Sequence, residues 1–143
     1  MFSVVFTMDG KKFSVEEFIR LSHWKVSNFW IRGKKMPLGS RISPSSGLKI
    51  DICEFQTFER KKNSIKKKII AFIKNNQEIF NRLKTNKSVQ YGIDIGFIEG
   101  WTGYFCLGTH LDSELLSILA RNKVQLTFSV YFGGRKNGIR ILT

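Results

Sequence analysis

The stretch SVQYGIDIGFI, residues 88–98, decides the fold because its apolar side chains recur at every second position. Alternation of this kind places apolar side chains on one face of a β-strand and polar or small ones on the other. The same pattern recurs elsewhere in the chain, strongly at 2–8 and 124–132 and in shorter runs at 25–32, 48–55 and 101–107. A half-buried antiparallel sheet is the structure that this pattern favours.

We expect the strands at 2–8, 89–98 and 124–132 to lie in one antiparallel sheet. Phe6, Ile93 and Phe128 fall on the apolar face of these strands, so the sequence places them in the core of the sheet.

Three helices are predicted between the strands. The first begins after Ser14, where Glu17 completes a capping box and Phe13 with Phe18 form a hydrophobic staple. The other two helices are also predicted from a capping residue and from apolar residues at helical spacing.

The second predicted helix is the longest and begins at Ser64, with apolar residues at a spacing of three to four. Asn75 and Asn76 mark a point where it would break into two pieces. The third helix begins at Asp112 and ends near Asn122.

These elements predict an α+β fold, with an antiparallel sheet and helices packed on one of its faces. The expected order is β-α-β-β-α-β-β-α-β, and its two β-α-β halves suggest a ferredoxin-like arrangement around the long helix. All 143 residues are assigned to one domain. Residues 33–47 form a long loop rich in Pro, Gly and Ser, and 133–143 form a tail or an edge strand.

The chain carries 24 Lys and Arg against 11 Asp and Glu, which gives a formal charge of +13. A charge of this size attracts anionic partners. An AT-rich genome would also raise the lysine content without any functional cause, and the sequence leaves both explanations open.

The two cysteines, Cys53 and Cys106, lie far apart and form no CxxC motif. Buried, reduced thiols of a cytoplasmic protein are the interpretation that this spacing favours, although one disulfide between them is not excluded. The first residues show no basic leader and no signal peptide, and no apolar run is long enough to span a membrane. We therefore predict no membrane partner.

No group of residues in the sequence has the spacing of a catalytic or metal site. His23 and His110 are the only histidines, and His110 with Asp112 has no strong ligand spacing. Cys106 lies four residues before His110, in a strand where a reactive thiolate is not expected. The carboxylates, including Asp94, form no recognisable pair. We therefore predict a protein that is not an enzyme and needs no cofactor.

The most unusual run is ERKKNSIKKKIIAFIKNN, residues 59–76, with seven cations and one acid. A helix N-terminus favours acids, so lysines near the start of this predicted helix have the unfavourable sign and suggest an anionic partner. The long loop adds further cations. The predicted partner-binding face comprises Lys34, Lys35 and Arg41 from the loop and Arg60, Lys61, Lys62, Lys66 and Lys67 from the helix region. If the two groups lie apart, the helix group is the one that the sequence favours.

Several segments together resemble a widespread bacterial domain family that is described only as a domain of unknown function. They are DGKKFSVEEFIRLS (9–22), the IRG at 31–33, the amphipathic helix after the third strand, and ELLSILARNKVQLTFSVYF (114–132). Small Lys- and Asn-rich domains of this kind also look like the immunity proteins of contact-dependent or polymorphic toxin systems. The resemblance implies a binding function and carries over no catalytic residue.

The prediction for function is a cytoplasmic immunity protein that binds and neutralises an acidic toxin domain. An RNA- or DNA-binding module is the alternative. Nucleic-acid binders interleave aromatic or arginine side chains with their lysines, whereas the aromatics Phe72 and Phe80 of the second predicted helix fall on its apolar stripe. A lysine-rich face without exposed aromatics suits an acidic protein better.

Overall fold

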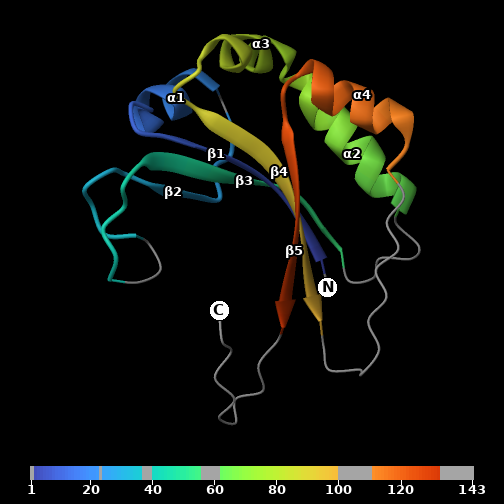
Figure 1. The fold of residues 1–143 in the computed structure, drawn as a ribbon, viewed down its shortest axis with the longest axis horizontal. Helices are drawn as coiled ribbons and strands as arrows, with labels where there is room; N and C mark the ends of the chain where they lie inside the picture. The colour runs from blue at the N-terminus through green and yellow to red at the C-terminus, as the bar shows by residue number, and fades with distance from the viewer. Residues whose placement is uncertain (1, 23, 37–39, 56–61, 100–110, 133–143) are drawn as a thin grey trace.

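A computed structural model of the chain describes residues 2–22, 24–36, 40–55, 62–99 and 111–132. It has five strands and four helices within these residues (Figure 1). In chain order they are β1 (Phe2–Gly10), α1 (Val15–Ser22), β2 (Asn28–Trp30), β3 (Ser46–Phe55), α2 (Lys62–Asn75), α3 (Gln77–Thr85), β4 (Gln90–Glu99), α4 (Ser113–Arg121) and β5 (Gln125–Phe132).

The strands form one sheet in the order β2-β3-β1-β4-β5. The neighbours β2 and β3, β3 and β1, and β1 and β4 all run antiparallel. The connection from β1 through α1 to β2 therefore skips one strand position, which β3 fills. The connection from β3 through α2 and α3 to β4 skips the position of β1 in the same way. The α+β class is confirmed.

The prediction of a wholly antiparallel sheet is wrong at one edge, because β5 runs parallel to β4. The prediction assumed that a strand at 101–107 turned the chain back before the last helix. That strand, like the tail at 133–143, lies outside the described residues. Parallel neighbours need a crossover of a dozen or more residues that usually contains a helix, and the connection with α4 supplies it.

The expected single long helix is divided into α2 and α3, so the predicted order of elements is also wrong at this point. The division falls at Asn75 and Asn76, the pair at which a break was foreseen. The Asn76 side chain donates to the carbonyl of Phe72 at 2.7 Å and accepts a hydrogen bond from Trp24 Nε1. The break thereby fixes the loop after α1 to the junction of the two helices.

The core lies between the sheet and its helices. Phe6 and Ile93 are buried with helix residues such as Ile69, Phe80 and Leu119 in one cluster, which confirms the predicted positions of these two strand residues. The helices therefore pack on the face that carries Phe6. On the opposite face, alternating positions such as Lys49, Asp51 and Thr127 are exposed.

Phe6 is the centre of this core, with no exposed surface. Its ring lies 5.5 Å from Trp24, 5.4 Å from Phe72, 5.6 Å from Phe80 and 6.4 Å from Tyr91, measured between ring centroids. These rings come from β1, β4, α2, α3 and the loop after α1, so one side chain joins most of the layers.

The placement of Phe128 in the core is wrong, because 37 % of its surface is exposed. Phe128 pairs with Ile95 of β4 and lies on the core face, as the alternation predicted. However, β5 is an edge strand, and its last residues extend past α2 and α4 (Figure 1). Alternation identifies a face of the sheet, whereas burial depends on which part of that face the helices cover.

The predicted helix caps are largely confirmed. Ser14 Oγ accepts from the Glu17 amide at 3.4 Å, and the rings of Phe13 and Phe18 lie 5.5 Å apart as a staple requires. Asp112 caps α4 by accepting from the Leu115 amide at 3.0 Å.

The C-terminus of α4 holds a buried polar group, Asn122, with 2 % of its surface exposed. Its Oδ1 accepts from Gln77 Nε2 at 2.7 Å, and its Nδ2 donates to the Ile118 carbonyl at 2.9 Å. Its own carbonyl accepts from the Tyr91 hydroxyl at 2.8 Å. Asn122 therefore connects α4 to α3 and to β4.

No helix within the described part of the chain is long and apolar enough to cross a membrane.

Candidate functional site

The predicted helix group of cations is partly occupied within the molecule. Lys66 Nζ lies 2.6 Å from a carboxylate oxygen of Asp112 and 2.6 Å from one of Glu114. Both hydrogen bonds, first that to Asp112 and then that to Glu114, raise the pKa of Lys66 above its ordinary value. Lys66 thus holds α2 against the start of α4.

The predicted start of this helix is too late, although its first turn still contains Lys62 and no acid. The helix begins at Lys62, two residues before the predicted cap at Ser64, so Lys66 and Lys67 follow the first turn instead of lying in it. The dipole effect falls off within one turn, so these lysines lose little stability from it. Arg60 and Lys61 lie outside the described residues.

The predicted long loop at 33–47 is a short antiparallel arm in its described part. Lys35 and Ile42 form a β-bridge, and the Ser43 amide donates to the Lys34 carbonyl at 2.9 Å. Lys34, Lys35 and Arg41 are all exposed on this arm. Their backbone is ordered by hydrogen bonds while their charges face solvent.

The two predicted groups of cations lie at opposite ends of β3. The arm leads into the first residue of β3, Ser46, and α2 follows its last residue, Phe55. A strand of 10 residues spans roughly 30 Å at about 3.3 Å per residue. Figure 1 shows the arm beyond β2 on one side and α2 on the other. The structure therefore does not bring the described members of the two groups, Lys34, Lys35 and Arg41 on the arm and Lys66 and Lys67 on α2, into one face.

The arm instead belongs to a larger cluster, which we call the basic end. It is the end of the sheet where β1 and β2 finish and β3 and β4 begin. Its seven cations are all exposed: Lys11, Lys12, Arg32, Lys34, Lys35, Arg41 and Lys87. Arg32 Nη1 donates to the Lys11 carbonyl at 3.4 Å, which joins the base of the arm to the turn after β1.

An open hollow of about 540 Å³ lies within the basic end, and we call it the basic depression. Its described lining includes Lys11, Lys12 and Lys87 with one carboxylate, Asp9, which accepts from Ser45 Oγ at 3.1 Å. The hollow forms where β1 meets the start of β4. A Cβ on Gly10 would lie 2.4 Å from the Ser88 carbonyl oxygen, so only glycine permits this approach.

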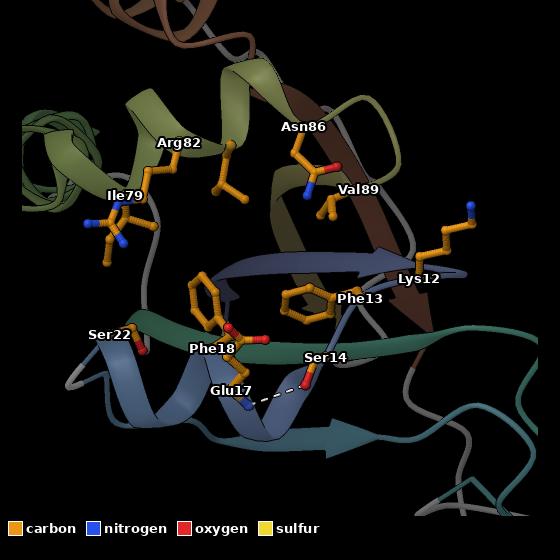
Figure 2. A pocket seen from close by; sticks show the side chains of 11 residues that line it. Lys12, Phe13, Ser14, Glu17, Phe18, Ser22, Ile79, Arg82, Asn86 and Val89 are labelled. Carbon is orange, nitrogen blue, oxygen red and sulfur yellow. Dashed lines mark hydrogen bonds between the residues drawn. The ribbon is translucent and has the colours of Figure 1, made fainter.

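A second hollow adjoins the first, between α1 and α3, and we call it the apolar pocket. It is open to solvent and has a volume of about 270 Å³. Figure 2 shows the rings of Phe13 and Phe18 in its middle, with Arg82 and Asn86 above them and Lys12 at one side. Lys12 lines both hollows, so they adjoin at this side chain.

Within the described residues, no group of three His, Cys, Asp or Glu side chains has the arrangement of a metal site. Cys53 is a free thiol packed against the core, and burial raises its pKa, an effect that Lys68 partly opposes. A raised pKa gives a thiol of low reactivity at neutral pH. His23, His110 and Cys106 lie outside the described residues.

Sequence reasoning missed Lys11, Lys12, Arg32 and Lys87 as members of the site. Lys11 and Lys12 follow the first strand and Lys87 precedes a later one. The alternating strands at 2–8 and 88–98 could have shown the connection. If they pair antiparallel, the end of the first strand meets the beginning of the other, and the lysines in these turns become neighbours.

Comparison of the chain with models of known protein families, with curated proteins and with solved structures found no match.

Proposed function

We propose that the protein is a non-enzymatic binding protein whose basic end holds an acidic protein. In its most specific form, the proposal is a cytoplasmic immunity protein that binds and neutralises an acidic toxin domain. The toxin assignment rests on the resemblance described above. The choice of surface rests on the charge distribution around the sheet.

One observation carries the choice of surface. Seven exposed cations gather at the basic end, and the one carboxylate among the described lining residues of its depression is Asp9. In the helix group, Lys66 has two carboxylate neighbours, Asp112 and Glu114. Unneutralised charge steers an oppositely charged partner and raises its association rate, as rapid neutralisation of a toxic enzyme requires.

A nucleic acid is the second candidate, and one observation favours it. Phe29 of β2 is 48 % exposed, and Arg32 follows it at the basic end. An exposed aromatic side chain beside arginine is what a single-stranded nucleic acid requires for stacking. Successive side chains of a strand point to opposite faces, so Phe29 and Trp30 cannot both stack bases on the same surface. We therefore rank this function second.

The test uses two triple variants that change the net charge equally at different places. One replaces Lys34, Lys35 and Arg41 with Glu, and the matched control replaces Lys62, Lys67 and Lys74 with Glu. Lys66 is kept in both because it binds α4. The immunity proposal expects the gene immediately upstream to encode a toxic C-terminal domain, which is the partner in this test. Association is followed by stopped-flow fluorescence at several salt concentrations.

We expect the arm variant to slow association about tenfold or more at low salt, because steering contributes factors of that order or above. The control should change the rate far less. Co-expression of the wild-type chain should restore growth to cells that make the toxic domain. Equal slowing in both variants would place the interface elsewhere, and the lack of an upstream toxin gene would remove the immunity assignment. Tight, sequence-selective binding of a labelled single-stranded RNA would promote the second candidate.

A further inference from the structure

We infer that the apolar pocket receives an apolar side chain of the acidic partner, while carboxylates beside that side chain bind Lys12 and the lysines of the basic depression. This inference rests on the proposed function, because it describes how the same partner would be held. It adds a recognition element that charge alone does not supply.

The interior of the pocket is suited to one hydrophobic group. Phe13 and Phe18 are partly buried, and Leu83 and Val89 are buried at its inner wall. Ile79 of α3 completes the apolar lining. The pocket volume of about 270 Å³ lies just below the range of roughly 300–1,000 Å³ that small-molecule and cofactor sites occupy. An inserted side chain fits this space better than a cofactor does.

The rim of the pocket specifies the charge of what surrounds that side chain. Lys12 and Arg82 are the cations of the rim, and Glu17 is its one described acid. Arg82 is bound to Glu78 at 3.1 Å, whereas Lys12 makes no salt bridge with a described residue. Lys12 also lines the basic depression with Lys11 and Lys87, so carboxylates next to the inserted group would lie close to further cations.

In many protein interfaces, the residues that contribute most to affinity differ from those that steer the partner, and this arrangement has the same division. A side chain buried in a central pocket contributes most of the affinity, and the charged rim steers the partner and sets its orientation. The apolar pocket would therefore slow dissociation, and the basic end would speed association. The two effects can be separated by experiment.

The experiment uses two short fluorescein-labelled peptides. The first has a central phenylalanine between runs of aspartate, and in the second alanine replaces the phenylalanine. Affinity is measured by fluorescence anisotropy at low ionic strength. Four variants are compared with the wild-type protein: Ile79→Gln at the pocket, Ile118→Gln on α4 as its control, Lys12→Gln at the shared rim, and Lys74→Gln as its control. Both isoleucines are partly buried against the core, so the two substitutions should affect stability to a similar extent. A difference in peptide affinity between the two variants then reports the position of the binding site.

We expect the wild type to bind the phenylalanine peptide about tenfold or more tightly than the alanine peptide, as burial of an aromatic side chain implies. Ile79→Gln should abolish most of that difference, and Ile118→Gln should keep it. Lys12→Gln should lower the affinity for both peptides. Lys74→Gln should leave both affinities unchanged.

The outcomes separate the inference from the proposed function. Equal affinity for the two peptides, with strong salt dependence, overturns the pocket and leaves the basic end as the binding surface. Binding of neither peptide, together with unchanged association of the arm variant with the toxic domain, overturns both. Binding of free 3-phenylpropionate as tightly as the phenylalanine peptide would overturn the inference in favour of a small-molecule site.

Discussion

Phe6→Ala and Phe128→Ala are the same substitution on the same face of the sheet, and they should differ several-fold in their effect on stability. Phe6 is fully buried among four aromatic rings. Its truncation leaves a cavity that the surrounding layers cannot fill, so we expect a loss of about 3–5 kcal/mol in the free energy of unfolding.

Phe128→Ala should lower the free energy of unfolding much less. Complete burial of such a side chain is worth about 1.5–3 kcal/mol, and 37 % of Phe128 remains exposed. The buried fraction corresponds to about 1–2 kcal/mol, with no closed cavity to add to it. The position on an edge strand limits the loss further.

Urea titration followed by circular dichroism measures both losses, provided that the slope with denaturant concentration stays constant. Phe6→Leu serves as a milder variant at the same position if Phe6→Ala does not fold. Equal losses at the two positions would contradict the assignment of Phe6 to the centre of the core and of Phe128 to its uncovered margin. A loss under about 1 kcal/mol at Phe6 would do the same.

Four further outcomes are expected. Lys123 has a φ of 53°, so Lys123→Gly should raise the unfolding free energy by about 0.5–1 kcal/mol in a urea titration, because glycine adopts this conformation without strain. A lower unfolding free energy would contradict this prediction. Asn122→Ala should lower the unfolding free energy by about 2 kcal/mol, because two side-chain hydrogen bonds are removed at a buried site, and an unchanged midpoint would exclude this role. The pKa of Lys66 is raised from its ordinary value of 10.5, so the wild type should be more stable than Lys66→Met below that pH. This difference in unfolding free energy should disappear as the pH rises through the higher pKa of the folded state. A difference that stays constant up to strong alkali would contradict the ion pairs. In a Cys106→Ser background, Cys53 should react with a disulfide reagent more slowly than in the urea-unfolded chain at neutral pH, since burial raises its pKa, and equal rates would show an exposed thiol.

Local rules account for the parts of the fold that the sequence predicted correctly. Alternation at 88–98 identified β4 and the core position of Ile93, and capping chemistry identified the start of α1 at Ser14. The break after α2 was visible in the pair Asn75 and Asn76. Each of these features depends on neighbours within a few residues, so the chain encodes it directly.

The candidate site was predicted only in part, and the reason is tertiary. Lys34, Lys35 and Arg41 were identified correctly as exposed cations of an extended loop. The expectation that they share a face with the helix group was not met. The sequence also gave no reason to suspect that Lys66 is bound by two acids that follow it by more than 40 residues.

The sequence by itself determined the types of element, the face of each strand that is apolar, and the excess of positive charge. The tertiary structure alone decided that β5 runs parallel at an edge, that helices leave Phe128 partly exposed, and that the turns with Lys12 and Lys87 meet in one hollow. Periodicity is fixed by bonds between neighbouring residues. Strand order and direction depend on how the connections cross the sheet, and no single segment contains that information.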